Sequence, residues 1–240
     1  MAPTQRKIEA NLHRIRANIE VACAKANRHG DDVRVIAVTK SVDEEIIRRV
    51  VAAGVSDLGE SRVQQLTSRA EALNAWNGRR RKSDGPLRWH MIGHLQRNKV
   101  KAVVDLGAVV HSVDTLRLAE EIQQHAAGQG RIAEVLLQVN CGEEEQKFGV
   151  AVGAAVHLGE MVASLSNVRL VGLMTMAPRV EDPEQARPVF QRLAEIFEEM
   201  SKEGIGGEHF RHLSMGMSQD YIVAVEEGAT MVRIGRALLE

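Results

Sequence analysis

Eight short apolar segments alternate with seven longer amphipathic segments along this 240-residue chain. We predict strands at residues 34–40, 56–59, 88–93, 108–113, 133–140, 169–175, 212–215 and 230–235. We predict helices between them at residues 43–53, 62–73, 98–105, 115–127, 150–164, 183–202 and 218–227. The strand segments are nearly continuous in apolar residues, which is typical of parallel strands buried on both faces. This number and order of elements is that of a (β/α)8 barrel.

A further helix is predicted at the N-terminus, where apolar residues recur at three- and four-residue steps, namely Ile8, Leu12, Ile15 and Ile19. The predicted fold class is therefore α/β, a single (β/α)8 TIM barrel spanning residues 1–240 with an extra N-terminal helix. An open, doubly wound sheet shares the alternation, but no G-x-G-x-x-G motif follows a strand. The polar segment 77–85 is predicted to be a loop and not a domain boundary.

Residues that favour helix ends support several of these bounds. Asp43, Thr115 and Ser218 are predicted N-caps, because a short polar side chain can accept a hydrogen bond from the first turn. Gly54 and Gly228 are predicted helix stops.

The composition excludes several classes of protein. The 31 Lys and Arg residues nearly cancel the 32 Asp and Glu residues, and aromatic residues make up only 3% of the chain. This balance argues against partners such as nucleic acid or an anionic membrane. No uncharged apolar run approaches the roughly 18 residues of a spanning helix, and the charged N-terminus lacks a signal-peptide core. With only Cys23 and Cys141, no disulfide framework is possible, and we expect a cytoplasmic protein.

Lys40 is the most informative polar residue. In a (β/α)8 barrel the working residues gather at the carboxyl ends of the strands, and Lys40 directly follows the apolar run 35–38. Burial near the core would lower its pKa toward that of a nucleophilic amine, the condition for a Schiff base. Alternatively, Lys40 extends out of the barrel and pairs with Glu60 or Asp43. Position alone does not decide between these two interpretations.

A candidate anion site lies in the last two strand-to-helix connections. In the segment 214–218 (SMGMS), Gly216 would let the backbone approach a ligand, and Ser218 would cap a helix whose first N–H groups are free. Gly235 could expose backbone N–H groups, while Arg233 needs an anionic or acceptor partner. An ordinary helix cap and a structural salt bridge are the alternatives. Because phosphate sites of this fold are often built at these two positions, their co-occurrence favours a phosphate site.

Two histidine pairs raise the question of a metal site. His90 and His94 are four residues apart at a predicted strand-to-loop boundary, where this spacing does not place both side chains on one face. His209 and His212 are accompanied by neither an H-E-x-x-H motif nor a cysteine pair. We therefore predict no metal site.

Several motifs together resemble one known family. The segments AVTK, LGESRVQQL, WHMIGHLQRNK, HSVD, QVNCGEEEQKFGV, GLMTMAP, LSMGMSQDY and VRIG resemble the pyridoxal phosphate homeostasis proteins, in order from Val35 to Gly235. Each motif is weak alone, but their shared order is specific. The resemblance implies a fold-type III barrel like the alanine racemase N-terminal domain. It also implies that the chain is usually monomeric and binds pyridoxal 5'-phosphate (PLP) without established catalytic turnover.

The resemblance also implies roles for individual residues. Lys40 would carry PLP as a covalent aldimine. Ser218 and the backbone around Gly235 and Arg236 would hold the phosphate. Arg233 would face the pyridine nitrogen, as the equivalent arginine does in alanine racemase barrels.

Two further positions qualify the expected cofactor site. We also expect two more residues to contact the cofactor, namely Met217 in the SMGMS segment and Ser61 after the second strand. Ser61 stands where the family usually has Asn, so a ring contact by that amide is not expected. Arg236 stands where a small hydroxyl residue is usual, so no side-chain hydroxyl is available there for the phosphate. The backbone N–H of Arg236 would bond to the phosphate, and its guanidinium could supply positive charge.

The expected function is intracellular PLP homeostasis by binding, buffering or delivery of the cofactor to PLP-dependent apoenzymes. The alternative is a PLP-dependent amino-acid racemase, and a third option is a barrel enzyme that takes a phosphorylated substrate without PLP. A racemase needs a second base, which alanine racemases take from a tyrosine of a second domain. Tyr221 is the single tyrosine, and only five residues follow Gly235, so we expect no racemase activity.

Overall fold

The computed structural model describes residues 2–79, 85–143 and 148–240. Within these residues, eight parallel strands close into a barrel. The strands are β1 (Arg34–Val38), β2 (Asp57–Glu60), β3 (Arg88–Met91), β4 (Val109–Val113), β5 (Ala133–Gln138), β6 (Val168–Met174), β7 (His212–Met217) and β8 (Met231–Ile234). Each strand pairs with its neighbours in sequence, and β1 pairs with β8. The predicted (β/α)8 barrel is therefore confirmed.

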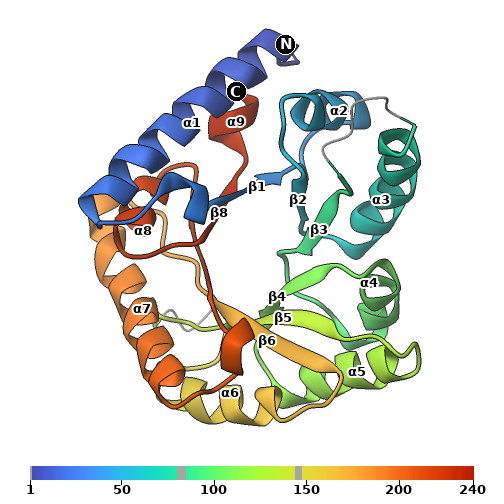
Figure 1. Ribbon diagram of the computed structural model, residues 1–240, viewed down its shortest axis with the longest axis vertical. Coiled ribbons are helices and arrows are strands. Elements are labelled where there is room, and N and C mark those ends of the chain that lie inside the picture. Colours follow the sequence, from blue (N-terminus) through green and yellow to red (C-terminus); the bar gives the residue numbers. More distant parts are fainter. Residues whose placement is uncertain (1, 80–84, 144–147) are drawn as a thin grey trace.

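Helices surround this ring of strands (Figure 1). The α-helices are α1 (Gln5–Lys25), α2 (Glu44–Ala52), α3 (Val63–Asn77), α4 (Val100–Leu106), α5 (Leu116–Ala127), α6 (Ala155–Ala163), α7 (Arg187–Lys202), α8 (Tyr221–Glu226) and α9 (Arg236–Leu239). Short 3₁₀ helices are η1 (Gly30–Asp32), η2 (Arg97–Lys99), η3 (Val152–Ala154), η4 (Pro183–Ala186) and η5 (Gly207–His209). None of the helices in the described ranges is long and apolar enough to cross a membrane.

Most of the predicted helix ends are confirmed. The side chain of Asp43 accepts a hydrogen bond from the backbone of Ile46 and begins α2, and Thr115 does the same for Leu118 at the start of α5. These bonds satisfy N–H groups that have no partner within the helix. Gly54 and Gly228 both follow helix ends with positive φ angles of 93° and 98°, which glycine adopts without strain.

Several predicted bounds differ from the structure, and four of the differences lie near Lys40, Ser218 and Gly235. The first strand ends at Val38, because the N–H of Val42 turns back to the carbonyl of Thr39. The seventh strand extends two residues further, to Met217. The last predicted helix begins at Tyr221 and not at residue 218, and the short helix α9 was not predicted. Most of the predicted loop 77–85 lies outside the described residues.

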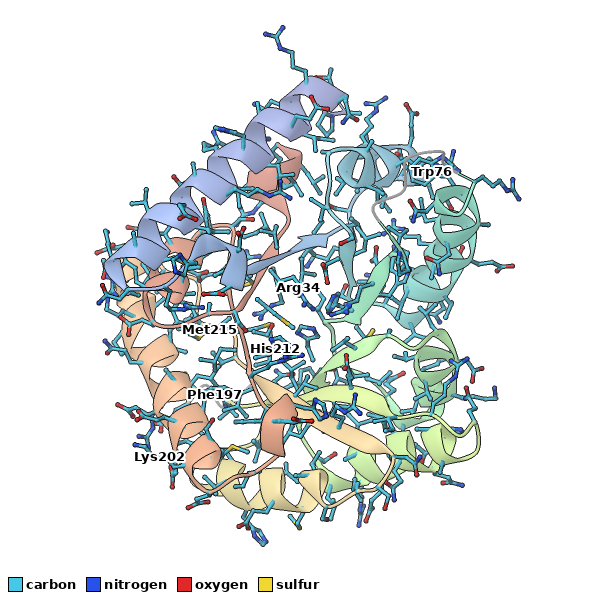
Figure 2. All side chains as sticks on the ribbon, viewed as in Figure 1. Arg34, Trp76, Phe197, Lys202, His212 and Met215 are labelled. Atoms are coloured by element: carbon cyan, nitrogen blue, oxygen red, sulfur yellow. The ribbon has the colours of Figure 1, made fainter. Side chains whose placement is uncertain are left out.

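The interior of the barrel contains both apolar and polar side chains. The large apolar core lies between the strands and the helices, whereas a separate small cluster consists of Val109, Leu136, Val171 and Met174. Several polar side chains are also buried, among them His90, His111, Ser214 and Arg233. Figure 2 shows Arg34 and His212 inside the ring of strands and Phe197 and Lys202 on α7 outside it. The barrel is thus not filled by hydrocarbon alone.

The N-terminal helix α1 supports the last part of the chain. Its predicted apolar face is buried, and it lies beside α8 and α9 (Figure 1). Asn11 donates a hydrogen bond from its Nδ2 to the carbonyl of Leu238 at 3.1 Å, and Asn18 donates to the Tyr221 hydroxyl at 2.8 Å. These bonds fix the connections that follow β7 and β8.

Candidate functional site

Several of the predicted site residues lie together at the carboxyl ends of β1, β7 and β8, which are neighbours in the barrel. Because β1 and β8 pair in parallel, Lys40 and Gly235 leave the barrel at the same end. In the pairing of β7 with β8, Met217 lies opposite Arg233, which brings Ser218 to that end as well. We refer to the place formed by Lys40, Ser218 and Gly235 as the rim.

Lys40 is exposed, so the prediction that it is buried near the core is wrong. The strand ends before it, and the preceding Thr39 is the buried residue, with its hydroxyl donating to Glu60. The predicted ion pair with Glu60 or Asp43 is also absent among the described residues. Glu60 instead pairs with Arg69, and Asp43 caps α2. Lys40 therefore presents a primary amine at the rim without a partner in the described ranges.

Ser218 does not cap the helix that follows it, so that prediction is wrong. The N-cap of α8 is Asp220, which makes no side-chain cap bond. The Oγ of Ser218 instead accepts hydrogen bonds from the backbone N–H groups of Gly235, at 3.3 Å, and Ala237, at 3.1 Å. The hydroxyl thus joins the connections after β7 and β8. Because both bonds use its lone pairs, its own proton remains available for an acceptor.

Backbone N–H groups at the rim are also available. Among the residues that the structure describes, the N–H groups of Ser218 and Arg236 have no acceptor. The side chain of Arg236 is exposed and donates to the Oε1 of Gln219 at 2.9 Å. Free N–H groups beside a hydroxyl and a guanidinium favour an anion. The arrangement therefore agrees with the predicted anion site, although its hydrogen bonds differ from the predicted ones.

Gly216 packs against α8. It was predicted instead to let the backbone approach a ligand. Its φ is +90°, and a Cβ atom there would lie 2.6 Å from the Cβ of Ala224 and 2.9 Å from the Cα of Tyr221. Glycine is therefore required because α8 packs directly against β7.

The buried carboxylate of Asp220 fixes the start of the same connection. It accepts a hydrogen bond from the backbone N–H of Met217 at 2.6 Å. Burial raises the pKa of Asp220, and the bond from Met217 and the charge of Arg233 oppose that rise. The side chain of Met217 is half-buried. Asp220 thus orders the turn that presents Ser218.

Arg233 is buried inside the barrel, with three hydrogen bonds to neutral acceptors. Its Nη1 donates to the carbonyl and to the Oγ of Ser214, both at 2.7 Å, and its Nη2 donates to the carbonyl of Thr175 at 2.8 Å. No carboxylate of the described residues bonds to it, so the alternative of a structural salt bridge is wrong. Burial lowers the pKa of Arg233 to about 10. Its Nε–H has no acceptor in the described part of the chain and can donate to a ligand.

Ser61 follows β2, which is paired with β1. The backbone of Ser61 packs against Gly93, where a Cβ atom would lie only 2.3 Å from the Ser61 carbonyl oxygen. Next to it, Glu60 is fully buried, and its Oε2 has no hydrogen-bond partner in the described ranges. These residues form the side of the barrel end next to Lys40.

The histidine pairs do not converge on one point. His90 lies inside the barrel, whereas His94 stacks on Phe148 with ring centroids 4.0 Å apart. Among the described residues, no group of three or more His, Cys, Asp or Glu side chains is arranged to hold a metal ion.

A buried polar chain inside the barrel was missed by the sequence analysis. It connects Asp57, His90, His111 and Ser214 to Arg233 through hydrogen bonds. The available signal was His111, a titratable residue in the middle of the apolar strand sequence VVHSV. Sequence spacing could not show that His111 meets Ser214, which lies 103 residues further along the chain.

Comparison with known proteins relates the chain to one family and to solved structures of the same fold. Residues 10–239 match the family described as alanine racemase, N-terminal domain. The chain is 40% identical over 227 residues to a pyridoxal phosphate homeostasis protein of Aquifex aeolicus, covering 95% of each chain. Its fold is similar to that of an unknown protein from Bifidobacterium adolescentis (TM-score 0.91, 35% identity, 98% and 95% covered). It is also similar to PipY of Synechococcus elongatus with PLP bound (TM-score 0.81, 28% identity, 97% and 100% covered).

Proposed function

Because the chain belongs to the alanine racemase N-terminal domain family, and within it to the pyridoxal phosphate homeostasis proteins, we propose that it binds PLP at the rim. One observation carries the proposal. An unpaired lysine amine, free backbone N–H groups beside the Ser218 hydroxyl, and a buried guanidinium lie on or directly after three neighbouring strands at one end of the barrel. PipY, a relative that matches 97% of this chain over its own full length, has been solved with PLP bound.

The residues present match the functional groups of PLP. The cofactor has an aldehyde, a phosphate and a ring nitrogen, and when bound it supplies an electrophilic carbon conjugated to the ring. The primary amine of Lys40 can attach to the aldehyde carbon, with loss of water. Ser218 and the N–H of Arg236 offer donors for the phosphate. The unpaired Nε–H of Arg233 offers a donor for the ring nitrogen.

The proposed role is to hold and release the cofactor without turnover. A guanidinium beside the ring nitrogen disfavours protonation of that nitrogen, which weakens the ring as an electron sink. The single tyrosine, Tyr221, is buried, and its hydroxyl accepts a hydrogen bond from Asn18 of α1. It is therefore not placed to act as a second base at the rim. We propose further that PLP-dependent apoenzymes receive the cofactor from this protein, which acts as a monomer.

Titration of the purified protein with PLP tests the proposal. We expect a new visible absorption band that saturates at one equivalent of PLP and is absent in Lys40→Ala. Lys202→Ala is the matched control, because Lys202 lies on α7 outside the barrel and pairs with Glu198. Absence of saturable PLP binding to the wild-type protein would refute the proposed function.

The racemase alternative is tested with the PLP-loaded protein in deuterated water. We expect little exchange of the α-hydrogen of any amino acid, because Tyr221 is buried and held by Asn18 and so is not placed to act as the second base. Rapid exchange that disappears in Lys40→Ala would identify the protein as an enzyme.

A further inference from the structure

A continuous chain of hydrogen bonds crosses the inside of the barrel. The Oδ1 of Asp57 lies 2.9 Å from the Nε2 of His90. The Nδ1 of His90 lies 2.9 Å from the Nε2 of His111, whose Nδ1 lies 2.9 Å from the Oγ of Ser214. Ser214 in turn accepts the hydrogen bond from Arg233. We refer to Asp57, His90, His111 and Ser214 as the relay.

The relay runs from the amino end of β2 to Arg233 in the interior of the barrel. Asp57 is the first residue of β2, and its side chain is 15% exposed, whereas His90, His111 and Ser214 are all completely buried. The members belong to β2, β3, β4 and β7, and Arg233 belongs to β8. Such a chain forms only when the sheet is closed, because β4 and β7 are not neighbours.

The chemistry of the two ends fixes where the protons lie. Arg233 can only donate, so Ser214 accepts from it; if His111 is neutral and carries its proton on Nε2, Ser214 donates its own proton to the Nδ1 of His111. An ionised Asp57 can only accept, so His90 carries its proton on Nε2 and accepts at Nδ1 from the Nε2–H of His111. With both histidines neutral, every donor along the relay points toward Asp57. Hydrogen bonds aligned in this way polarise and strengthen one another.

The charges around the relay support this arrangement of protons. Burial lowers the pKa of His90 and lowers that of His111 well below its usual value, so both remain neutral. Despite the opposing effect of burial, the bond from His90 and the charge of Arg34 hold the pKa of Asp57 below its usual value.

Other charged or titratable groups also face the relay. Arg88 and His212 face it from β3 and β7 near the Asp57 end. Asp220 lies near the other end and acts on Arg233. Arg233 is therefore a buried cation that hydrogen-bonds directly only to neutral groups, while the relay leads to the carboxylate of Asp57.

We propose that His111 is a positioning residue for PLP binding. Through Ser214 it fixes the orientation of the Arg233 guanidinium. Its aligned hydrogen bonds also couple that guanidinium electrostatically to the carboxylate of Asp57. This proposal rests on the proposed function, because the orientation of Arg233 matters for the ring nitrogen of PLP. A purely structural role explains it less well. Apolar side chains would fill the same space without the cost of burying four polar groups in one continuous chain.

The proton positions are tested first in the PLP-free protein by ¹⁵N NMR of the histidine rings. We expect His90 and His111 to be neutral at pH 7, both protonated on Nε2 and not on Nδ1. This measurement needs no variant, so it does not depend on whether a substitution is tolerated. A cationic ring, or a proton on the Nδ1 of His111, would overturn the proposed arrangement.

The effect on the cofactor is tested with Ser214→Ala. This variant removes the hydroxyl that joins His111 to Arg233 but keeps the Ser214 carbonyl as an acceptor. The matched control is Ser112→Ala, since Ser112 is also a buried serine of the barrel but donates to the Gly93 carbonyl. We expect Ser214→Ala to bind PLP about tenfold more weakly and to shift the pH dependence of the visible band. We also expect faster hydrogen exchange of the Arg233 guanidinium, measured without PLP.

The outcomes separate the two proposals. If Ser214→Ala keeps the wild-type pH dependence and guanidinium exchange, His111 does not position Arg233, and the inference is wrong while PLP binding stands. The same is true if Ser112→Ala changes both quantities equally, because the effect would then be one of general packing. If the wild-type protein does not bind PLP at all, the proposed function fails, and with it the role of the relay.

Discussion

Removal of the Ser218 hydroxyl provides a quantitative test of the phosphate site. The hydroxyl accepts the N–H groups of Gly235 and Ala237 and therefore directs its proton away from them. If that proton bonds to the phosphate, Ser218→Ala loses one charge-assisted hydrogen bond, worth about 1.5–3 kcal/mol. Since about 1.4 kcal/mol corresponds to a factor of ten, the Kd for PLP should rise about 10- to 140-fold.

The same substitution should affect pyridoxal much less, because pyridoxal has no phosphate to accept the bond. The assay is a competition titration in which the Kd values of PLP and pyridoxal are measured for both proteins. Ser201→Ala is the control, since Ser201 lies on α7 and its hydroxyl donates to the carbonyl of Phe197. If Ser218→Ala weakens PLP and pyridoxal by the same factor, or leaves both unchanged, the hydroxyl does not contact the phosphate and the assignment is wrong.

Three further predictions concern stability. Gly216→Ala should lower the free energy of unfolding, measured by urea denaturation, by about 2–4 kcal/mol. The φ of +90° is unfavourable for alanine, and the new methyl group would collide with Ala224. A loss below about 1 kcal/mol would contradict the packing described. Asn11→Ala should cost about 1–2 kcal/mol by removing the bond to the Leu238 carbonyl, and a neutral effect would show that α1 does not need this tether. The free energy of unfolding should fall as the pH drops from 6.5 to about 4. Burial lowers the pKa of His212 to about 4, so the unfolded chain binds more protons than the folded chain in that window. His212→Phe should reduce the slope of unfolding free energy against pH, and an unchanged slope would exclude His212 as its source.

The fold could be predicted because its signal is local and repeated. Each strand is a short apolar run, and caps such as Asp43 and Thr115 mark helix starts through bonds that span three residues. The position of Lys40 shortly after the apolar residues of the first strand was also visible in this way. Its exposure was not, because it depends on which of Thr39 and Lys40 faces the core after the strand has ended.

The parts of the site that could not be predicted depend on closure of the barrel. The Ser218 hydroxyl bonds to residues 17 and 19 positions further along the chain, although a cap of the next helix was the local expectation. His111 meets His90 across paired strands and Ser214 across the interior. Sequence spacing cannot show such contacts, because they join strands that are distant along the chain. The residue types were visible, but their partners were not.

We propose that Lys40 carries the cofactor covalently. The most direct test is to load the protein with PLP, reduce it with borohydride, digest it and locate the modified lysine by mass spectrometry. We predict one reduced PLP adduct per chain, on the peptide that contains Lys40, and no adduct at equal yield on exposed lysines such as Lys101 or Lys202. An adduct on another lysine with Lys40 unmodified would contradict the account.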